Sequence, residues 1–302
     1  MDSVREFGRF AQSLGCETLF GEPMSRHTTF RIGGPADLFL TVTDVPSLEK
    51  VCRKAAETGV RLFPLGNGSN LLVSDAGIRG AVLAFGGDFK KTALCGENSI
   101  QCGSGASLAS ASAFARDHGL TGLEFAWGIP GSVGGAAFMN AGAYEHSMAE
   151  VIASCDHVTQ EGETGTLATG EIGYGYRQSV YMRGGYFITS VRLTLTRGYP
   201  EKISARMDDL YARRKAKQPL ELPSAGSVFK RPEGHFAGAL IEQCGLKGRR
   251  VGGAAVSEKH AGFIVNLGSA TCTDVQRLIE LIQETVLRET GVRLECEIKA
   301  VC

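Results

Sequence analysis

Residues 60–74 read VRLFPLGNGSNLLVS, and this stretch decides the fold. An apolar run typical of a β-strand ends in a turn with two glycines, two asparagines and a serine, and a second apolar run follows. Glycines allow backbone N–H groups to approach a ligand closely, so the turn Pro64–Leu71 can direct several amides at an anion such as a diphosphate. An ordinary glycine turn, in which Asn and Ser bond their own backbone, has the same composition. The turn alone leaves both interpretations open.

A second segment, GIPGSVGGAAFMNAG at 128–142, has the same chemistry at greater length. It lies in an uncharged run from Phe125 to Tyr144 that contains Pro130, Asn140 and five glycines. In hydrocarbon a backbone broken by proline and glycine would leave polar groups unpaired, so we predict a buried loop and no membrane insertion. Two such loops in one chain favour a long phosphorylated cofactor over structural packing alone.

Helices and strands are predicted around these loops. Residues Ser47–Thr58 space their apolar side chains as an amphipathic helix, with Asp44 as the start signal and Gly59 as the stop. Another helix is expected over about residues 107–118, with Ser107 as its cap rather than as a nucleophile. Residues 150–198 alternate apolar and polar positions in short runs separated by glycine, which indicates antiparallel β-structure.

The best domain boundary is at Gly198–Pro200, and strands and helices then alternate to the C-terminus. The last helix is predicted to begin at a Thr273 cap and to end at Gly291. The stretch VRLECEIKAV at 292–301 predicts one alternating strand, with Glu295 and Glu297 on the same polar face.

Composition excludes several classes of function. The 302 residues carry 32 Lys and Arg against 32 Asp and Glu, so no whole-chain field collects a polyanion and no nucleic-acid partner is expected. Nine cysteines without a CxxC pair fit a reducing cytoplasmic location better than a disulfide framework or a zinc site, and six histidines include no metal-binding spacing. No secretory signal is expected in the first residues, which carry several charges and no continuous apolar core. The absence of GxGxxG and of a Gly-Lys dipeptide disfavours a dinucleotide Rossmann unit and a P-loop.

Four polar residues have both a functional and a structural interpretation. Arg177 offers a planar set of donors suited to a carboxylate or phosphate, or it forms a surface ion pair. Ser227 follows a glycine and enters an apolar step, which suits an oriented hydroxyl that donates a proton or a simple turn serine. Glu297 faces a cleft or water, and His260 is functional or a satisfied structural histidine.

Seven segments together resemble one family, the UDP-N-acetylenolpyruvoylglucosamine reductases (MurB) of peptidoglycan precursor synthesis, in its shorter, type II branch. In chain order the segments are TTFRIGGPAD (28–37), PLGNGSNLL (64–72), GIPGSVGGAAFMNAGAY (128–144), YRQS (176–179), SAGSVFKRP (224–232), GGAAVSEKHAGFIVN (252–266) and LECEIK (294–299). They appear in the order of the family and extend over nearly the whole chain, which makes the resemblance specific.

The resemblance implies an α+β fold in three parts. Residues 1–85 and 86–198 would form the two subdomains of an FAD-binding region like that of the PCMH (vanillyl-alcohol oxidase) flavoproteins, and residues 199–302 would form an α+β substrate-binding domain. The diphosphate of FAD would be held by the two glycine loops. A covalent flavin link is not expected there, because Pro64–Leu71 contains no His, Cys or Tyr.

The activity implied by the resemblance is the reduction of UDP-N-acetylenolpyruvoylglucosamine to UDP-N-acetylmuramate, with non-covalent FAD and with NADPH as co-substrate. Arg177 would bind and polarise the substrate carboxylate. Glu297 would help to organise that carboxylate as a hydrogen-bonding partner, and Ser227 would protonate C2. The substrate would also be held by Tyr176, Lys217, Lys230 and Arg231. The implied cofactor contacts are Gly66, Asn67, Gly68, Ser69, Asn70, Leu71, Ile129, Pro130, Gly131, Ser132, Gly134, Gly135, Ala136, Asn140 and Gly142.

Two alternatives remain at this point. Another PCMH-type flavin oxidoreductase, acting on a sugar or alcohol, would keep both glycine loops without needing Arg177, Ser227 and Glu297 together. A non-catalytic module that binds a UDP-sugar or a flavin would not need a proton donor. Glu295 also competes with Glu297 for the role of the functional carboxylate, since the predicted strand places both on one face.

Overall fold

The computed structural model describes residues 2–302, and the chain forms two compact units. The first unit contains the residues up to Phe20, Leu38–Asn67 and Gly80–Arg213, and the second contains Gly21–Asp37, Gly68–Arg79 and Arg214–Cys302. Each unit is therefore assembled from three separate stretches of chain. Helices and sheets occur in both, so the fold is of the expected α+β class.

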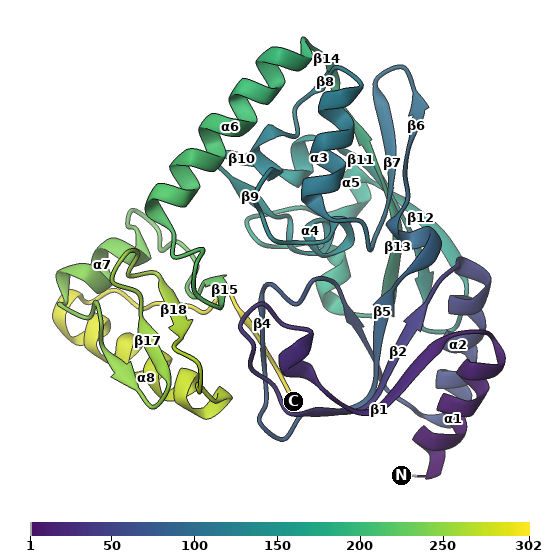
Figure 1. The fold of residues 1–302 in the computed structure, drawn as a ribbon, viewed down its shortest axis with the longest axis horizontal. Coiled ribbons are helices and arrows are strands. Elements are labelled where there is room, and N and C mark those ends of the chain that lie inside the picture. Colours follow the sequence, from purple (N-terminus) through teal and green to yellow (C-terminus); the bar gives the residue numbers. More distant parts are fainter. Residues whose placement is uncertain (1) are drawn as a thin grey trace. The chain divides into compact units, whose positions relative to one another are not determined.

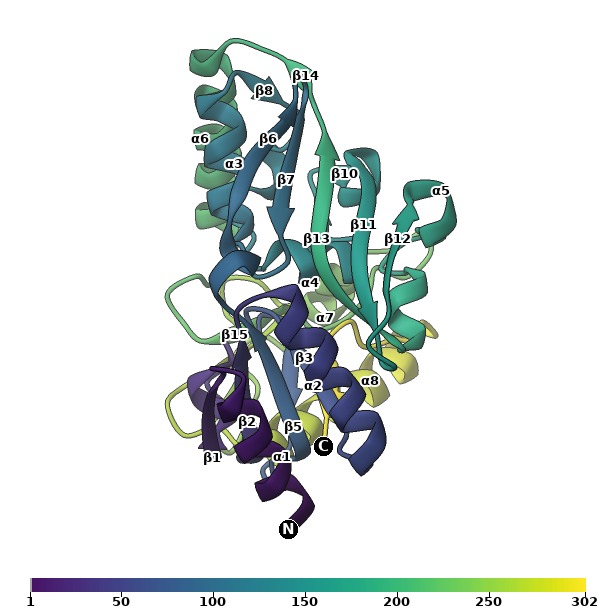
Figure 2. The same ribbon diagram turned by 90° about the vertical axis from the view of Figure 1, so that its right-hand side faces the viewer.

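A four-stranded sheet, most of which belongs to the first unit, has the order β1-β2-β5-β3, and two helices pack on it (Figure 2). These elements are β1 (Glu17–Pro23), β2 (Pro35–Val42), β5 (Ile78–Phe85), β3 (Leu62–Leu65), α1 (Asp2–Ser13) and α2 (Val45–Thr58). Strands β3 and β5 run parallel, with Leu65 opposite Ala84. Because the edge strand β3 ends at Leu65, the first glycine turn begins at the end of this strand.

Both ends of α2 follow from residues close to them in sequence. The Asp44 carboxylate accepts the N–H of Ser47 at 2.8 Å, and Gly59 ends the helix with a φ of 68°. Aspartate at this position satisfies an N–H that has no partner within the helix, and glycine takes the left-handed conformation without a Cβ penalty. The predicted helix and both of its signals are confirmed.

The second sheet of the first unit has five antiparallel strands in the order β12-β11-β13-β7-β6 (Figure 2). Its strands are β12 (Thr164–Ala168), β11 (Ile152–Thr159), β13 (Tyr186–Thr194), β7 (Ser99–Gly103) and β6 (Thr92–Gly96). Three of them lie within residues 150–198, so the antiparallel prediction for that range is confirmed.

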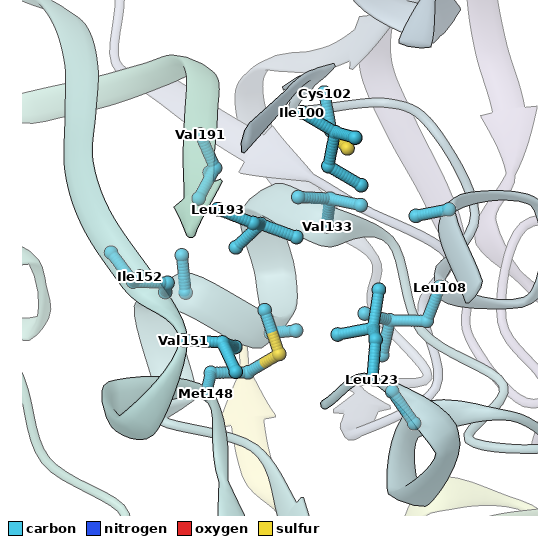
Figure 3. Close-up of a cluster of buried hydrophobic side chains, with 14 of the residues drawn as sticks. Ile100, Cys102, Leu108, Leu123, Val133, Met148, Val151, Ile152, Val191 and Leu193 are labelled. Atoms are coloured by element: carbon cyan, nitrogen blue, oxygen red, sulfur yellow. The ribbon is translucent and has the colours of Figure 1, made fainter. Parts of the chain in front are cut away.

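One face of this sheet buries the hydrophobic core shown in Figure 3. Ile100 and Leu193 from the strands share this cluster with Leu108 of α3 (Leu108–Asp117). The hydroxyl of Ser107 accepts the N–H of Ser110 at 2.9 Å, so Ser107 caps α3 as predicted.

The uncharged glycine segment differs from the prediction of a loop, because it contains the seven-residue helix α4 (Val133–Met139). Ser132 caps this helix, and Val133 at its start is fully buried in the core. The helix forms despite its glycines because its first N–H groups bond to the segment before α3: Val133 N donates to Ala106 O and Gly134 N to Ser104 O, both at 2.8 Å. Tertiary contacts thus override a weak intrinsic helix propensity.

The remaining elements of the first unit are short, except for α6. They are η2 (Gly87–Lys90), β8 (Leu120–Thr121), η3 (Glu124–Ala126), β9 (Gly142–Ala143), β10 (His146–Ser147), η4 (Met148–Glu150), α5 (Thr169–Ile172), η5 (Val180–Arg183), β14 (Thr196–Arg197) and α6 (Pro200–Lys217), whose last residues belong to the second unit. None of the helices formed by residues 2–302 is both long and apolar enough to cross a membrane.

The second unit contains a four-stranded antiparallel sheet in the order β15-β18-β17-β16, and α7 and α8 pack against it (Figure 1). Its elements are η1 (Met24–Arg26), β4 (Leu71–Val73), β15 (Ser224–Ser227), α7 (Ala237–Gln243), β16 (Arg250–Val251), β17 (Ala254–Val256), β18 (Phe263–Asn266), α8 (Cys272–Thr290) and β19 (Lys299–Val301). The buried Phe30 and Ile32 also belong to this core, so the TTFRI segment lies within the second unit.

Helix α8 begins two residues earlier than predicted. Its cap is Thr271, whose hydroxyl accepts the N–H of Asp274 at 3.0 Å. The predicted cap, Thr273, lies instead in the first turn, where its N–H and hydroxyl both donate to the carboxylate of Asp75. The Asp75 carboxylate, from a distant segment, also accepts the N–H of Cys272 at 2.7 Å and so bonds the first turn of α8 twice through its backbone. The predicted end at Gly291 is confirmed by its left-handed conformation.

The long final strand predicted over residues 292–301 is wrong in its extent, since β19 covers only Lys299–Val301. Along this stretch the backbone changes the segment to which it hydrogen-bonds. Glu297 N donates to Val228 O at 2.7 Å, whereas Lys299 N donates to Asn70 O at 2.9 Å, where β19 pairs in parallel with β4. A single ladder cannot continue through such an exchange.

Candidate functional site

In the first unit, the two glycine-rich segments predicted to bind the cofactor lie directly against each other. A Cβ placed on Gly66 would lie 2.5 Å from the hydroxyl of Ser132 and 3.9 Å from the Cα of Gly135. A separation of 2.5 Å is far inside van der Waals contact, so this approach requires glycine at position 66. The structure therefore brings together Gly66, Ser132 and Gly135, three of the predicted contacts.

The backbone donors of the two segments differ in what they bond. The N–H groups of Val133, Gly134 and Gly135 already have acceptors within the protein, the last of them the Ser132 hydroxyl at 3.2 Å. In contrast, the N–H groups of Gly66 and Asn67 have no protein acceptor within the part of the chain that the structure describes. The amides with hydrogen-bonding capacity for an anion are thus those of the first turn, not those at the start of α4.

Ser104 is a candidate that the sequence did not single out. Its hydroxyl is buried beside Gly134 and has no hydrogen-bonding partner among residues 2–302. A buried hydroxyl without a partner is costly, so a ligand atom is its natural complement. The signal in the sequence was the pair of glycines on either side of Ser104. Unbonded amides, an unpartnered hydroxyl and surfaces without Cβ atoms fit a phosphate-bearing cofactor such as FAD.

Arg177 is held by the C-terminal end of the second glycine segment. Its guanidinium donates to the carbonyls of Asn140 and Gly142, each at 3.2 Å, and lies 5.1 Å from the centre of the Tyr176 ring. Asn140 itself has a φ of 45°, and its side-chain amide donates to Gly175 O at 2.9 Å. Predicted cofactor residues and predicted substrate residues thus form one hydrogen-bonded group in the first unit.

The backbone of Arg177 is strained, with a φ of 53°. A residue with a side chain in the left-handed region costs roughly 1–2 kcal/mol. Such strain persists only where the surroundings fix it, and it concentrates at functional positions. The tight turn around Arg177 supplies that constraint, since Gly175 and Gln178 exchange two backbone hydrogen bonds, each at 3.2 Å.

In the second unit, the segments of Ser227 and Glu297 pair directly. Phe229 and Cys296 form an antiparallel bridge, and Glu297 N donates to Val228 O at 2.7 Å. The Ser227 hydroxyl donates to Phe229 O at 3.2 Å and is half-buried. The segments that carry two residues predicted from separate motifs are thereby adjacent.

Ser227 owes its place to an irregularity in the sheet. Ser224 lies opposite Val265 and Ser227 lies opposite Phe263, so three steps along β15 match two steps along β18. Gly226, inside this bulge, has a φ of 77°. A bulge redirects the side chain that follows it, which explains why a glycine precedes Ser227.

Glu295 and Glu297 have different surroundings, although one shared face was predicted. The Glu295 carboxylate is exposed and lies 3.1 Å from the ammonium of Lys230. Glu297 is half-buried, and its backbone carbonyl accepts the side-chain amide of Asn70 at 3.2 Å. The first glycine turn therefore contacts the Glu297 segment within the second unit.

The other predicted substrate residues lie at the surface. Lys217 is the last residue of α6 and is exposed, as is Tyr176. The Arg231 guanidinium lies 4.0 Å from the centre of the Phe236 ring, which is itself exposed. Arg177 and Tyr176 belong to the first unit, whereas Lys217, Lys230 and Arg231 belong to the second. Within residues 2–302 no three His, Cys, Asp or Glu side chains gather in a metal-binding arrangement.

Comparisons with known proteins point in one direction. The profile of a family described as FAD binding domain matches residues 36–168, and that of UDP-N-acetylenolpyruvoylglucosamine reductase, C-terminal domain, matches residues 218–301.

Relatives of similar length carry the same name. The UDP-N-acetylenolpyruvoylglucosamine reductase of Exiguobacterium sibiricum is 48% identical over 94% of this chain and 92% of its own. That of Latilactobacillus sakei is 43% identical over 100% and 98%. The crystal structure of UDP-N-acetylenolpyruvylglucosamine reductase (MurB) from Thermus caldophilus matches with a TM-score of 0.82 and 37% identity, covering 95% of this chain and 99% of that one.

Proposed function

Because the chain belongs to the UDP-N-acetylenolpyruvoylglucosamine reductase family, we propose that it reduces UDP-N-acetylenolpyruvoylglucosamine to UDP-N-acetylmuramate with electrons from NADPH. The observation that carries the proposal is the direct pairing of the Ser227 and Glu297 segments, which a pure binding module would not need. Family membership likewise favours this activity over that of another sugar or alcohol flavin oxidoreductase.

We propose that FAD binds without a covalent link, held by the glycine-segment residues named above together with Ser104. When bound, FAD supplies the two-electron chemistry that connects NADPH oxidation with reduction of the substrate. The protein contributes the donors: the amides of Gly66 and Asn67 in the first unit suit a diphosphate, and glycine keeps the backbone accessible.

Residues 1–85 and 86–198 would form the two FAD-binding subdomains and residues 199–302 the substrate domain. A cytoplasmic location is also proposed, since all nine cysteines are free.

Arg177 is proposed to bind the carboxylate of the enolpyruvyl group. A guanidinium matches a carboxylate in charge and in planar geometry, and the bonds to Asn140 O and Gly142 O fix its orientation in advance. Negative charge that develops at C2 during reduction spreads into this carboxylate, so a fixed cation stabilises the transition state more than the ground state.

Ser227 is proposed to donate the proton that C2 requires. A serine hydroxyl is a weak acid in water and needs a partner that stabilises the negative charge on its oxygen. Glu297 would organise the surroundings as a hydrogen-bonding partner, and Tyr176, Lys217, Lys230 and Arg231 would hold other parts of the substrate. These roles rest on the match of each residue to its family motif and on the local geometry given above.

The function is tested by the visible absorption spectrum of the purified protein. We expect a flavin spectrum that NADPH bleaches in the absence of oxygen and that UDP-N-acetylenolpyruvoylglucosamine restores. Return of the colour with oxygen but not with the enolpyruvyl compound would favour an oxidase. A protein that shows no flavin spectrum even after FAD is supplied would contradict the cofactor assignment.

Gly134→Ala should impair flavin binding. The new Cβ would lie 2.6 Å from Ser104 Cβ and 3.0 Å from Ser104 O, so either α4 or the Ser104 segment must move. Such overpacking costs about 1–3 kcal/mol of stability, and we expect the dissociation constant of FAD to rise by roughly tenfold or more. Flavin content and an FAD titration measure the effect. The control is Gly170→Ala, where a Cβ meets nothing within 4 Å; equal flavin binding in both variants would remove Ser104 and α4 from the cofactor site.

A further inference from the structure

The backbone at Ser227 is anchored to the turn between β17 and β18. The N–H of Val228 donates to the carbonyl of Gly262 at 2.9 Å, and Ser227 lies opposite Phe263 in the sheet. A shift of Gly262 would therefore move the backbone that carries the Ser227 hydroxyl. Contacts that hold Gly262 in place consequently also hold Ser227 in place.

Two side chains close this turn by local hydrogen bonds. The buried hydroxyl of Ser257 accepts the N–H groups of Lys259 and His260, at 3.2 and 3.3 Å. The Nδ1 atom of His260 then accepts the N–H of Gly262 at 3.1 Å. The imidazole thus bonds the same peptide segment whose carbonyl holds Val228.

The direction of this bond settles the tautomer of the imidazole. Since Gly262 N–H donates to Nδ1, that nitrogen presents its lone pair, and the neutral ring carries its proton on Nε2. Burial lowers the pKa of His260 from 6.5. A hydrogen bond to its own backbone and the charge of Glu242 raise it, whereas Lys247 and Lys217 lower it. The net direction favours the neutral ring that can accept the bond.

Glycines leave the room that the ring occupies. A Cβ on Gly238 of α7 would lie 3.1 Å from His260 Cε1, and one on Gly262 would lie 3.0 Å from it. A Cβ on Gly262 would also lie 3.6 Å from the Ser227 hydroxyl. The imidazole and the hydroxyl therefore flank the same glycine, and the ring packs edge-on against Phe263 with their centres 5.0 Å apart.

We propose that His260 is a positioning residue for the proton donor Ser227, acting through the bond from Gly262 N–H to Nδ1 and the bond from Val228 N–H to Gly262 O. This rests on the proposed function of Ser227. His260 is not assigned a contact with substrate or cofactor. Its effect is confined to the step in which Ser227 acts, so reduction of the flavin by NADPH should not depend on it.

Three substitutions separate this role from general packing. In His260→Asn, the side-chain oxygen stands as many bonds from Cα as Nδ1 does, so the acceptor is kept. In His260→Gln, the oxygen is one bond further out, and in His260→Ala no acceptor remains. We expect reoxidation of the reduced flavin by UDP-N-acetylenolpyruvoylglucosamine to slow by about 10- to 100-fold in the Gln and Ala variants, as expected for a misplaced reacting group. The Asn variant should stay within about threefold of the wild type, and bleaching by NADPH should be unchanged in all three.

A second readout does not depend on activity. In the holoenzyme, the ¹⁵N shifts of the His260 ring should report a proton on Nε2, and hydrogen exchange at the Gly262 amide should accelerate in the Gln and Ala variants but not in Asn. Faster reoxidation in the Gln variant than in the Asn variant would assign the role to Nε2, and wild-type rates in all three would leave His260 without one; either result overturns the proposal. If wild-type flavin is not reoxidised by the enolpyruvyl compound, the proposed function fails instead, while the exchange and shift data still decide whether the hydrogen bond exists.

Discussion

Replacing Ser227 by alanine is expected to leave NADPH able to bleach the flavin but to slow its reoxidation by UDP-N-acetylenolpyruvoylglucosamine by about 10²- to 10⁴-fold, the usual contribution of a positioned general acid. The hydroxyl is the only group removed. Its bond to Phe229 O at 3.2 Å is lost, which costs about 0.5–1.5 kcal/mol of stability and is not expected to unfold the chain.

The measurement is stopped-flow absorbance of the flavin in each half-reaction separately, without oxygen. Ser224→Ala is a matched control, because Ser224 lies on the same strand at the other end of the bulge and is also half-buried. That variant should reoxidise at a rate close to the wild type. Normal turnover in Ser227→Ala would show that another group supplies the proton.

The elements that the sequence predicts well depend on residues close to one another in the chain. The cap of α2 needs only Asp44 and an N–H three residues later, and the cap of α3 likewise needs only Ser107 and Ser110. The alternation within 150–198 is similarly local, and the strands it indicates lie in one antiparallel sheet. In each case the hydrogen bond or the pairing follows from a fixed spacing.

The one helix that was missed depends on contacts that no local pattern encodes. Helix α4 has glycines that disfavour a helix by about 1 kcal/mol each, and it forms because its first amides bond to Ala106 and Ser104. The shift of the α8 cap from Thr273 to Thr271 is an error of another kind, because Thr271 and Asp274 form a capping box whose two residues are three apart in the sequence. Only the error at α4 comes from partners that are distant in sequence.

The candidate site shows the same division. The sequence motifs identify Gly66, Arg177, Ser227 and Glu297 as candidate site residues. It does not supply the left-handed conformation of Arg177 or the contact of Gly66 with Ser132, because both require the folded neighbours. The role of His260 was left open for a related reason. Its bond to Gly262 joins residues two apart in the sequence, but its effect on Ser227 depends on the bond between Val228 and Gly262, which forms only in the folded sheet.

Glu297→Gln is expected to lower the rate of flavin reoxidation by the enolpyruvyl substrate by about 10²-fold, because a changed hydrogen-bonding partner would misplace the reacting groups that it orients. Glutamine keeps the size of the side chain, and the backbone bonds of residue 297 to Val228 and Asn70 remain. The loss would therefore come from the hydrogen bonds that the carboxylate accepts, not from unfolding.

Glu295→Gln is the matched control, because the two glutamates are two residues apart and receive the same chemical change. Glu295 is exposed, and its ion pair with Lys230 is of the surface kind, worth about 0–1 kcal/mol. Reoxidation should stay within about threefold of the wild type, and bleaching by NADPH should be unaffected in both variants.

The two carboxylates differ because the backbone changes its hydrogen-bonding partner after Cys296. Residue 297 bonds both to the Ser227 segment and to Asn70 of the first glycine turn. The reverse ranking, with Glu295→Gln inactive and Glu297→Gln active, would mean that the carboxylate beside Lys230 serves the reaction and that the pairing of the Ser227 and Glu297 segments is only structural.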